Sequence, residues 1–186
     1  MDWILASASP RRRELLAELI ENFEILPSKG EEIVEGELTP EELVKALAFQ
    51  KANEVALRKE AQGKAVLGSD TVVALNGKVL GKPKDEADAI AMLSALSGKT
   101  HQVYTGVCIL CPNGQKLVEA DRTEVVFETL TKEQIRAYVA PGSPMDKAGA
   151  YGIQDGGLVK EIKGSFSNVV GLPLELCKRM INEVNH

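Results

Sequence analysis

The stretch of residues 66–83 constrains the fold of this chain most strongly, because it contains two apolar runs separated by Asn76-Gly77. This dipeptide tolerates the positive φ angles of a two-residue type I′ turn, so the pattern predicts a β-hairpin. The incoming run is apolar on both sides of a single carboxylate, Asp70. Burying a carboxylate is costly unless a cation, a metal or water lies beside it. The hairpin therefore predicts a polar site around Asp70.

A two-residue turn would place Thr71 opposite Lys82 and Asp70 opposite Pro83 in the hairpin. A carboxylate, a hydroxyl and an ammonium would then gather at its open end. This group could be a structural salt bridge that closes a strand end, or it could be a catalytic or metal site. The hairpin alone favours neither interpretation.

A second unusual feature lies near the N-terminus, where Ser9-Pro10 is typical of a helix start. The first turn of that helix carries three arginines, although the helix dipole favours anions at this end. Arginines in this position, together with the exposed N–H groups of the helix, can hold a phosphate. We interpret Arg11 and Arg12 as an anion site, and we expect Arg13 to point into solvent.

A third cation is predicted to face inward from the next helix. A capping-box pattern at residues 39–42 starts this helix, and Lys51 falls within its apolar stripe. Such a lysine either extends its ammonium to the protein edge or reaches an anion. The preceding segment, residues 28–37, is an acidic loop in which Glu31 or Glu32 could hold a divalent cation, unless the loop is simply solvated.

The rest of the chain alternates helices and strands without regular βαβ units, which predicts a mixed sheet with helices packed around it. Asp85 is expected to cap a helix that ends near Gly98, and Asn113-Gly114 is expected to join two strands. A glycine-rich loop at 145–157 carries Tyr151 and Gln154. The expected elements after the hairpin are a helix at 85–98, strands at 101–111 and 115–128, a helix at 131–139, a strand at 158–163 and a helix from Pro173.

Composition limits the function. The 186 residues fit a single domain, 1–186, and the formal net charge of −5 argues against a polymeric nucleic acid as partner. No apolar run approaches the roughly 20 residues that span a membrane, so we expect a cytoplasmic protein. Cys108 and Cys111 would face opposite sides of one strand, which favours structural cysteines over a zinc or redox pair.

Four cations and two acids make up the candidate chemistry. This pattern suits the binding of a polyphosphate with a divalent metal and the activation of water against it. Serine chemistry is not expected, because the G-x-S-x-G motif is absent and one of the two histidines is the terminal residue. The candidates are Arg11, Arg12, Lys51 and Lys82 for the anion, and Asp70 with Glu31 or Glu32 for a metal or a proton.

Five motifs follow one another along the chain: Leu5-Ala-Ser-Ala-Ser-Pro-Arg-Arg-Arg-Glu-Leu-Leu16, Gly68-Ser-Asp-Thr71, Gly81-Lys-Pro83, Met145-Asp-Lys-Ala-Gly-Ala-Tyr-Gly-Ile-Gln154 and Val170-Gly-Leu-Pro173. In these motifs, which run nearly from end to end, the chain resembles the Maf family of nucleoside triphosphate pyrophosphatases. The resemblance implies hydrolysis of a nucleoside triphosphate to its monophosphate and pyrophosphate with Mg²⁺ or Mn²⁺. It also implies an α/β fold like that of the inosine triphosphate pyrophosphatases, with an elongated, twisted mixed sheet, flanking helices and two lobes around a cleft.

The resemblance also assigns roles to residues. Asp70 matches the proton acceptor, and Glu32 with Asp70 matches the metal ligands, although Glu31-Glu32 stands where the family usually has Asp-Glu. The motifs are similar to those of the branch that acts on dTTP and UTP. The phosphate-binding set is matched by Ser7, Arg11, Arg12, Lys51 and Lys82, and the positions associated with base choice by Arg12, Thr71 and Gln154.

Two expectations remain open at this point. A regulator of septum formation that senses nucleoside triphosphates without turnover would also need the cations, but it would have no need of Asp70 as a base. A homodimer is a further family expectation. Because the cations repel one another, we expect the loss of Arg12 or Lys82 to leave the melting temperature almost unchanged.

Overall fold

The computed structural model describes residues 1–30, 32–153 and 156–185, apart from the side chains of residues 143 and 144. The strands are β1 Trp3–Leu5, β2 Glu24–Ile25, β3 Ala65–Leu75, β4 Lys78–Leu80, β5 Thr100–Leu110, β6 Lys116–Phe127 and β7 Val159–Lys163. The α-helices are α1 Pro10–Ala17, α2 Pro40–Ala56, α3 Glu86–Leu96, α4 Lys132–Val139, α5 Phe166–Val170 and α6 Leu174–Val184. Short 3₁₀ turns are η1 Lys59–Ala61, η2 Ser143–Asp146 and η3 Ala148–Ala150.

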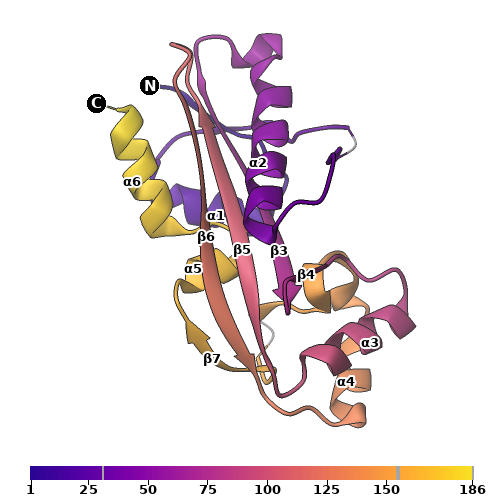
Figure 1. Cartoon of the computed structure of the whole chain (residues 1–186). Coiled ribbons are helices and arrows are strands. Elements are labelled where there is room, and N and C mark those ends of the chain that lie inside the picture. The colour runs from indigo at the N-terminus through magenta and orange to yellow at the C-terminus, as the bar shows by residue number, and fades with distance from the viewer. Residues whose placement is uncertain (31, 154–155, 186) are drawn as a thin grey trace.

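The strands form one mixed sheet in the order β2-β1-β3-β5-β6-β7, with β4 added to β3. β1 runs parallel to β2 and β3, whereas β3, β5, β6 and β7 pair antiparallel. The long strands β3, β5 and β6 run along the length of an elongated molecule (Figure 1). The predicted mixed α/β sheet with flanking helices is therefore confirmed.

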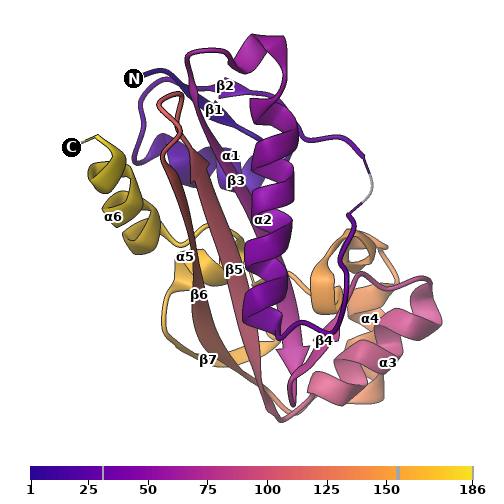
Figure 2. The ribbon, with the colours of Figure 1, turned by 45° about the horizontal axis from the view of Figure 1, so that its top comes forward.

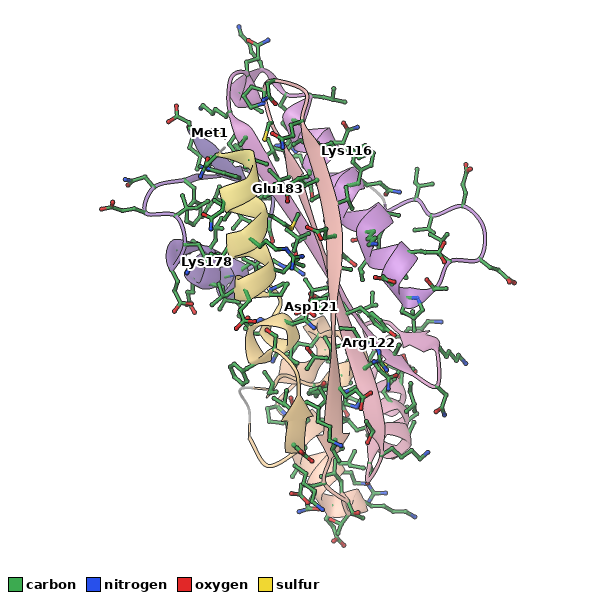
Figure 3. The ribbon with its side chains drawn as sticks, turned by 60° about the vertical axis from the view of Figure 1, so that its left-hand side comes forward. Met1, Lys116, Asp121, Arg122, Lys178 and Glu183 are labelled. Carbon is green, nitrogen blue, oxygen red and sulfur yellow. The ribbon has the colours of Figure 1, made fainter. Side chains whose placement is uncertain are left out.

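Helices cover the two faces of the sheet differently at its two ends. α2 lies along one face (Figure 2), where Ala48 and Val55 pack against Val66 and Cys108. α1 and α6 cover the opposite face, and Leu16 lies in their shared core cluster. α6 runs beside β6 in Figure 3. At the other end of the sheet, α3, α4 and η3 enclose a separate core cluster. None of the helices in the described part of the chain has the length and apolar character needed to cross a membrane.

Two glycines allow α2 to lie unusually close to the sheet. A Cβ on Gly68 would lie 2.6 Å from the Ala48 carbonyl oxygen, and one on Gly106 would lie 2.2 Å from the Val44 carbonyl oxygen. Real Cβ atoms do not approach other atoms this closely, so these positions require glycine. Asp70 pairs opposite Gly106 on this face of the sheet, so the close approach brings α2 directly over the carboxylate.

One edge of β3 carries two different partners. β1 pairs with residues 65–67 of β3, and β4 pairs with residues 73–75. Residues 68–72 lie between these two ladders and include Asp70 and Thr71. The sheet edge therefore changes partner at the position of the predicted site.

The predicted hairpin forms, but its ladder is shorter than expected. The turn at Asn76-Gly77 gives the predicted register, with Val73 opposite Leu80, and Asn76 adopts a positive φ of 53°. Pairing then stops at Leu80, so Lys82 and Pro83 leave the sheet instead of facing Thr71 and Asp70. Proline has no N–H to donate to a ladder, which limits pairing here.

Other predictions were confirmed or corrected locally. Cys108 and Cys111 are free and belong to core clusters on opposite faces of the sheet, as predicted. α5 was not predicted; Ser165 caps it by accepting from the Asn168 N–H. The glycine-rich segment before β7 was expected to be a loop, and it contains the short 3₁₀ turns η2 and η3.

Candidate active site

A cleft of about 1000 Å³ opens where β3 changes partner. Its walls come from the start of α1, the loop before α2, α2 itself, β3, β4, the η2–η3 region and the end of α5. The predicted site residues that the structure describes all line this cleft: Ser7, Arg11, Arg12, Glu32, Lys51, Asp70, Thr71 and Lys82. Glu31 and Gln154 lie outside the described residues, so the structure does not place them.

Asp70 lies on the wall of the cleft beneath α2 and is only 7% exposed. The Lys51 ammonium donates to its Oδ1 over 2.7 Å and also lies 3.2 Å from Glu32 Oε1. Lys51 therefore reaches an anion, as one of the two sequence interpretations had it. Burial raises the pKa of the Asp70 carboxyl, whereas Lys51 and Arg12 act to lower it. A carboxylate in this setting can accept a proton more readily than an exposed one.

Arg12 reaches the same cleft from the other face of β3. Its Nε donates to the Gly171 carbonyl oxygen over 2.8 Å, and its Nη2 donates to Thr71 Oγ1 over 3.0 Å. Burial lowers the pKa of the Arg12 guanidinium, and Asp70 acts in the opposite direction. Arg12 therefore joins α1 to the segment before α6. Loss of Arg12 would leave the buried Gly171 carbonyl only the longer 3.4 Å bond from Ser69 Oγ, so the structure leads us to expect a lower stability, in contrast to the expectation from charge repulsion.

A chain of buried polar side chains continues from Thr71 into the protein. Thr71 Oγ1 lies 2.8 Å from Thr105 Oγ1, which donates to the Asn168 carbonyl oxygen over 3.0 Å. The Asn168 amide donates in turn to Thr123 Oγ1 and to the Val103 carbonyl oxygen. The sequence analysis missed Thr105 and Asn168, because only the sheet order brings them behind Arg12.

The other predicted phosphate ligands differ in how they are held. Ser7 is buried, and its Oγ accepts from the Ser9 N–H over 3.2 Å. Arg11 is half-buried, and its Nε has no hydrogen-bond partner among the described residues. Lys82 is exposed at the rim of the cleft. Arg13 is exposed, as predicted.

Comparison with known proteins identifies the family. The sequence model of the family described as Maf-like protein matches residues 2–184. The chain belongs to this family.

Relatives and one solved structure extend this result. The Maf-like chain is 54% identical over 174 residues to the "dTTP/UTP pyrophosphatase" of Moorella thermoacetica. The aligned residues cover 92% of this chain and 89% of the relative. It is 50% identical over 175 residues to the protein of the same name from Thermococcus gammatolerans, and the aligned residues cover 93% of this chain and 91% of that relative. The HAM1 protein of Coxiella burnetii shares the fold, with a TM-score of 0.55 at 17% identity over 98% of this chain and 99% of that one.

The cleft in this Maf-like protein also has a mainly apolar part, which we call its apolar half. The side chains of Val79, Leu80, Val103, Tyr151 and Val169 line it, and Asp146 and Lys147 line the same cleft beside Tyr151. Behind Tyr151 lies His101, which is fully buried and whose Nε2 is 2.6 Å from the tyrosine hydroxyl oxygen. The sequence analysis used the histidines only to exclude serine chemistry, and it missed His101. A lone non-terminal histidine within a predicted strand was the available signal.

Proposed function

We propose that this protein hydrolyses dTTP and UTP to the nucleoside monophosphate and pyrophosphate in the cleft beside β3. The observation that carries the proposal is the buried Asp70 carboxylate, which lies 2.7 Å from Lys51 in a cleft that arginines and a further lysine also line. The names of the two relatives, each about half identical to this chain over nearly its whole length, support the choice of substrates.

The charged half of the cleft would hold the triphosphate. Arg11, Arg12 and Lys51 approach from α1 and α2, and Lys82 approaches from the rim. Cations fixed in this way stabilise the negative charge that develops on a departing pyrophosphate. Two N–H groups of Arg12 are engaged by Gly171 and Thr71, which orients the guanidinium before a ligand arrives.

Asp70 would act as the base. The oxygen of a water molecule attacks the α-phosphorus, the water proton passes to the Asp70 carboxylate, and the bond from the α-phosphorus to the bridging oxygen breaks. The pyrophosphate leaves with that bonding pair. Burial supports this role because it raises the pKa of Asp70 and so strengthens it as a proton acceptor, while Lys51 helps to keep it ionised.

A divalent cation fits the same residues. Glu32 and Asp70 share the Lys51 ammonium, so the two carboxylates already converge on one positive charge. Mg²⁺ is commonly bound by one or two carboxylates together with substrate phosphates. No group of three or more His, Cys, Asp or Glu side chains that could hold a metal occurs within the described ranges, so phosphate oxygens would have to complete the shell. When bound, such a cation would neutralise phosphate charge and lower the pKa of water.

The apolar half of the cleft would bind the nucleobase of the substrate. Thr71 and Arg12 also line the cleft. Gln154 is proposed to read the pyrimidine edge, because a side-chain amide can donate and accept together. This role for Gln154 rests on the family resemblance, since the residue lies outside the described ranges.

A panel of nucleoside triphosphates with Mg²⁺ or Mn²⁺ tests the proposal. We expect dTTP and UTP to give the monophosphate and pyrophosphate in equal amounts, and CTP, ATP and GTP to react more slowly. Release of inorganic phosphate instead would overturn the pyrophosphatase assignment. Tight binding of UTP without any turnover would favour the alternative function, a nucleotide-sensing regulator of septum formation.

A further inference from the structure

We propose that His101 is a positioning residue, which holds Tyr151 and thereby fixes the segment 147–153 as the wall of the cleft that contacts the nucleobase. This inference rests on the proposed function, because it assigns the nucleobase to the apolar half of that cleft. His101 itself does not line the cleft, whereas Tyr151 does. The histidine would therefore act only through the tyrosine.

A compact aromatic group attaches Tyr151 to the sheet. The rings of His101, Phe127 and Tyr151 meet edge to face, with centroid separations between 4.8 and 5.4 Å. His101 lies on β5 and Phe127 on β6, so two strands of the sheet hold the tyrosine ring. The hydrogen bond between His101 Nε2 and the tyrosine hydroxyl fixes the orientation of the Tyr151 ring within this group.

The backbone around Tyr151 is held in an unusual conformation. Ala150 has a φ of 65°, in the left-handed region that residues other than glycine rarely adopt. The preceding Gly149 also has a positive φ, and a Cβ there would lie 3.0 Å from the side chain of Val73. Such a conformation persists only where the surrounding structure enforces it, and such positions cluster at ligand sites.

Further hydrogen bonds attach the same segment to the end of β4 and to α4. The Gly149 N–H donates to the Gly81 carbonyl oxygen over 3.1 Å, next to Lys82. The Gly152 N–H donates to the hydroxyl of Tyr138 on α4 over 2.9 Å. Tyr151 lies between these two attachments in the chain, so the backbone on both sides of its ring is held.

A histidine at this position lowers the stability of the fold compared with an apolar ring. Its Nδ1 is buried and has no hydrogen-bond partner among the described residues. An apolar ring of similar size would avoid the cost of that polar atom. Among the described residues, the hydroxyl of Tyr151 is the hydrogen-bond partner of this polar ring, which points to a requirement for a fixed position of the tyrosine side chain.

Kinetics of Tyr151→Phe, His101→Phe and His101→Gln with UTP as substrate test the proposal. Inorganic triphosphate serves as a competitive inhibitor that lacks a nucleobase. We expect Tyr151→Phe and His101→Phe to raise KM for UTP about tenfold through loss of one oriented hydrogen bond. kcat should change much less, and the inhibition constant of triphosphate should stay the same. His101→Gln keeps a donor and should restore much of the loss.

Cys177→Ala is the matched control, because Cys177 on α6 is fully buried in a core cluster that does not contain Tyr151. It should lower the melting temperature without changing KM for UTP. Unchanged KM in Tyr151→Phe, or equal shifts in KM and in the triphosphate constant, would overturn the positioning role. Tyr151→Phe removes a single oxygen, so it decides the question even if His101→Phe does not fold. Failure of the wild-type protein to hydrolyse UTP would instead overturn the proposed function.

Discussion

Asp70 and His101 are both buried in the central strands, but they are used in opposite ways. Burial favours the neutral form of each group, so it raises the pKa of Asp70 and lowers the pKa of His101 to about 4. Lys51 and Arg12 oppose this effect at Asp70, whereas His101 meets the hydroxyl of Tyr151. The cations make a charged group available for chemistry at one end of the cleft. At the other end, a neutral hydrogen bond holds a wall in place.

Asp70→Asn should produce the largest effect, because the amide keeps the shape of the side chain and loses its basicity. We expect kcat for UTP to fall by ~10²–10⁴-fold, the contribution of a positioned general base. The dissociation constant of UTP should change only slightly, and equilibrium binding measured beside turnover checks both expectations. A variant that retains most of the wild-type kcat would make Asp70 a structural residue.

Arg12→Ala and Lys82→Ala compare a half-buried cation with an exposed one. Each should cost ~2–4 kcal/mol in kcat/KM, the range for losing one charge-stabilising donor. Arg12→Ala should also lower the melting temperature, because two hydrogen bonds, to the Gly171 carbonyl and to Thr71 Oγ1, are lost. Lys82 is exposed, so Lys82→Ala should have the same melting temperature as the wild type. Equal melting temperatures for the two variants would contradict the structural role of Arg12.

Gln154→Ala tests the neutral end of the cleft through substrate choice. Uracil and thymine present an N3–H between two carbonyls, whereas cytosine presents an acceptor at N3, so a fixed amide would be mismatched with cytosine. We expect the wild-type protein to prefer UTP over CTP by ~10²-fold in kcat/KM. Gln154→Ala should narrow this gap mainly by losing activity on UTP. Similar rates on all five common triphosphates in the wild type would remove this role.

The free energy of unfolding should depend on pH in opposite directions for the two buried groups, His101 and Asp70. The pKa of His101 is lower in the folded protein, so its contribution is present above pH 6.5 and is lost as the pH falls toward 4. Between pH 6.5 and 5 this loss is about 2 kcal/mol, at roughly 1.4 kcal/mol per pH unit. The folded pKa of Asp70 is raised, so its contribution is present below pH 3.8 and is lost as the pH rises through the raised value.

Urea denaturation at several pH values measures these slopes. His101→Phe should flatten the loss of stability on acidification, whereas Asp70→Asn should steepen it, because the opposing contribution disappears. Tyr151, the titratable residue hydrogen-bonded to His101, remains neutral over this range because burial raises the pKa of its hydroxyl. Parallel curves for the wild type and His101→Phe would show that His101 does not titrate as described.

Local signals were sufficient to predict most elements of the fold. The caps at Thr39, Asp85 and Thr131 each accept the backbone N–H that the sequence pattern required. Short-range rules failed at α5, where a five-residue helix is held mainly by its neighbours. They also failed beyond Leu80, where the hairpin ladder ends.

The candidate site was only partly predictable, because its residues meet through long-range packing. The inward position of Lys51 followed from helical spacing, but its contact with Asp70 depends on Gly68 and Gly106, which allow α2 to approach the sheet. Thr105 and His101 could not be placed without the order of the strands. Their partners, Thr71 and Tyr151, come from segments that are distant in the sequence.

Hydrolysis of UTP in ¹⁸O-labelled water, followed by mass spectrometry of both products, tests the central claim most directly. The account predicts one ¹⁸O atom in UMP and none in pyrophosphate, because water attacks the α-phosphorus while the cations hold the departing pyrophosphate. Label in the pyrophosphate would mean attack on the β-phosphorus, and it would contradict the roles proposed for Asp70 and for the cations.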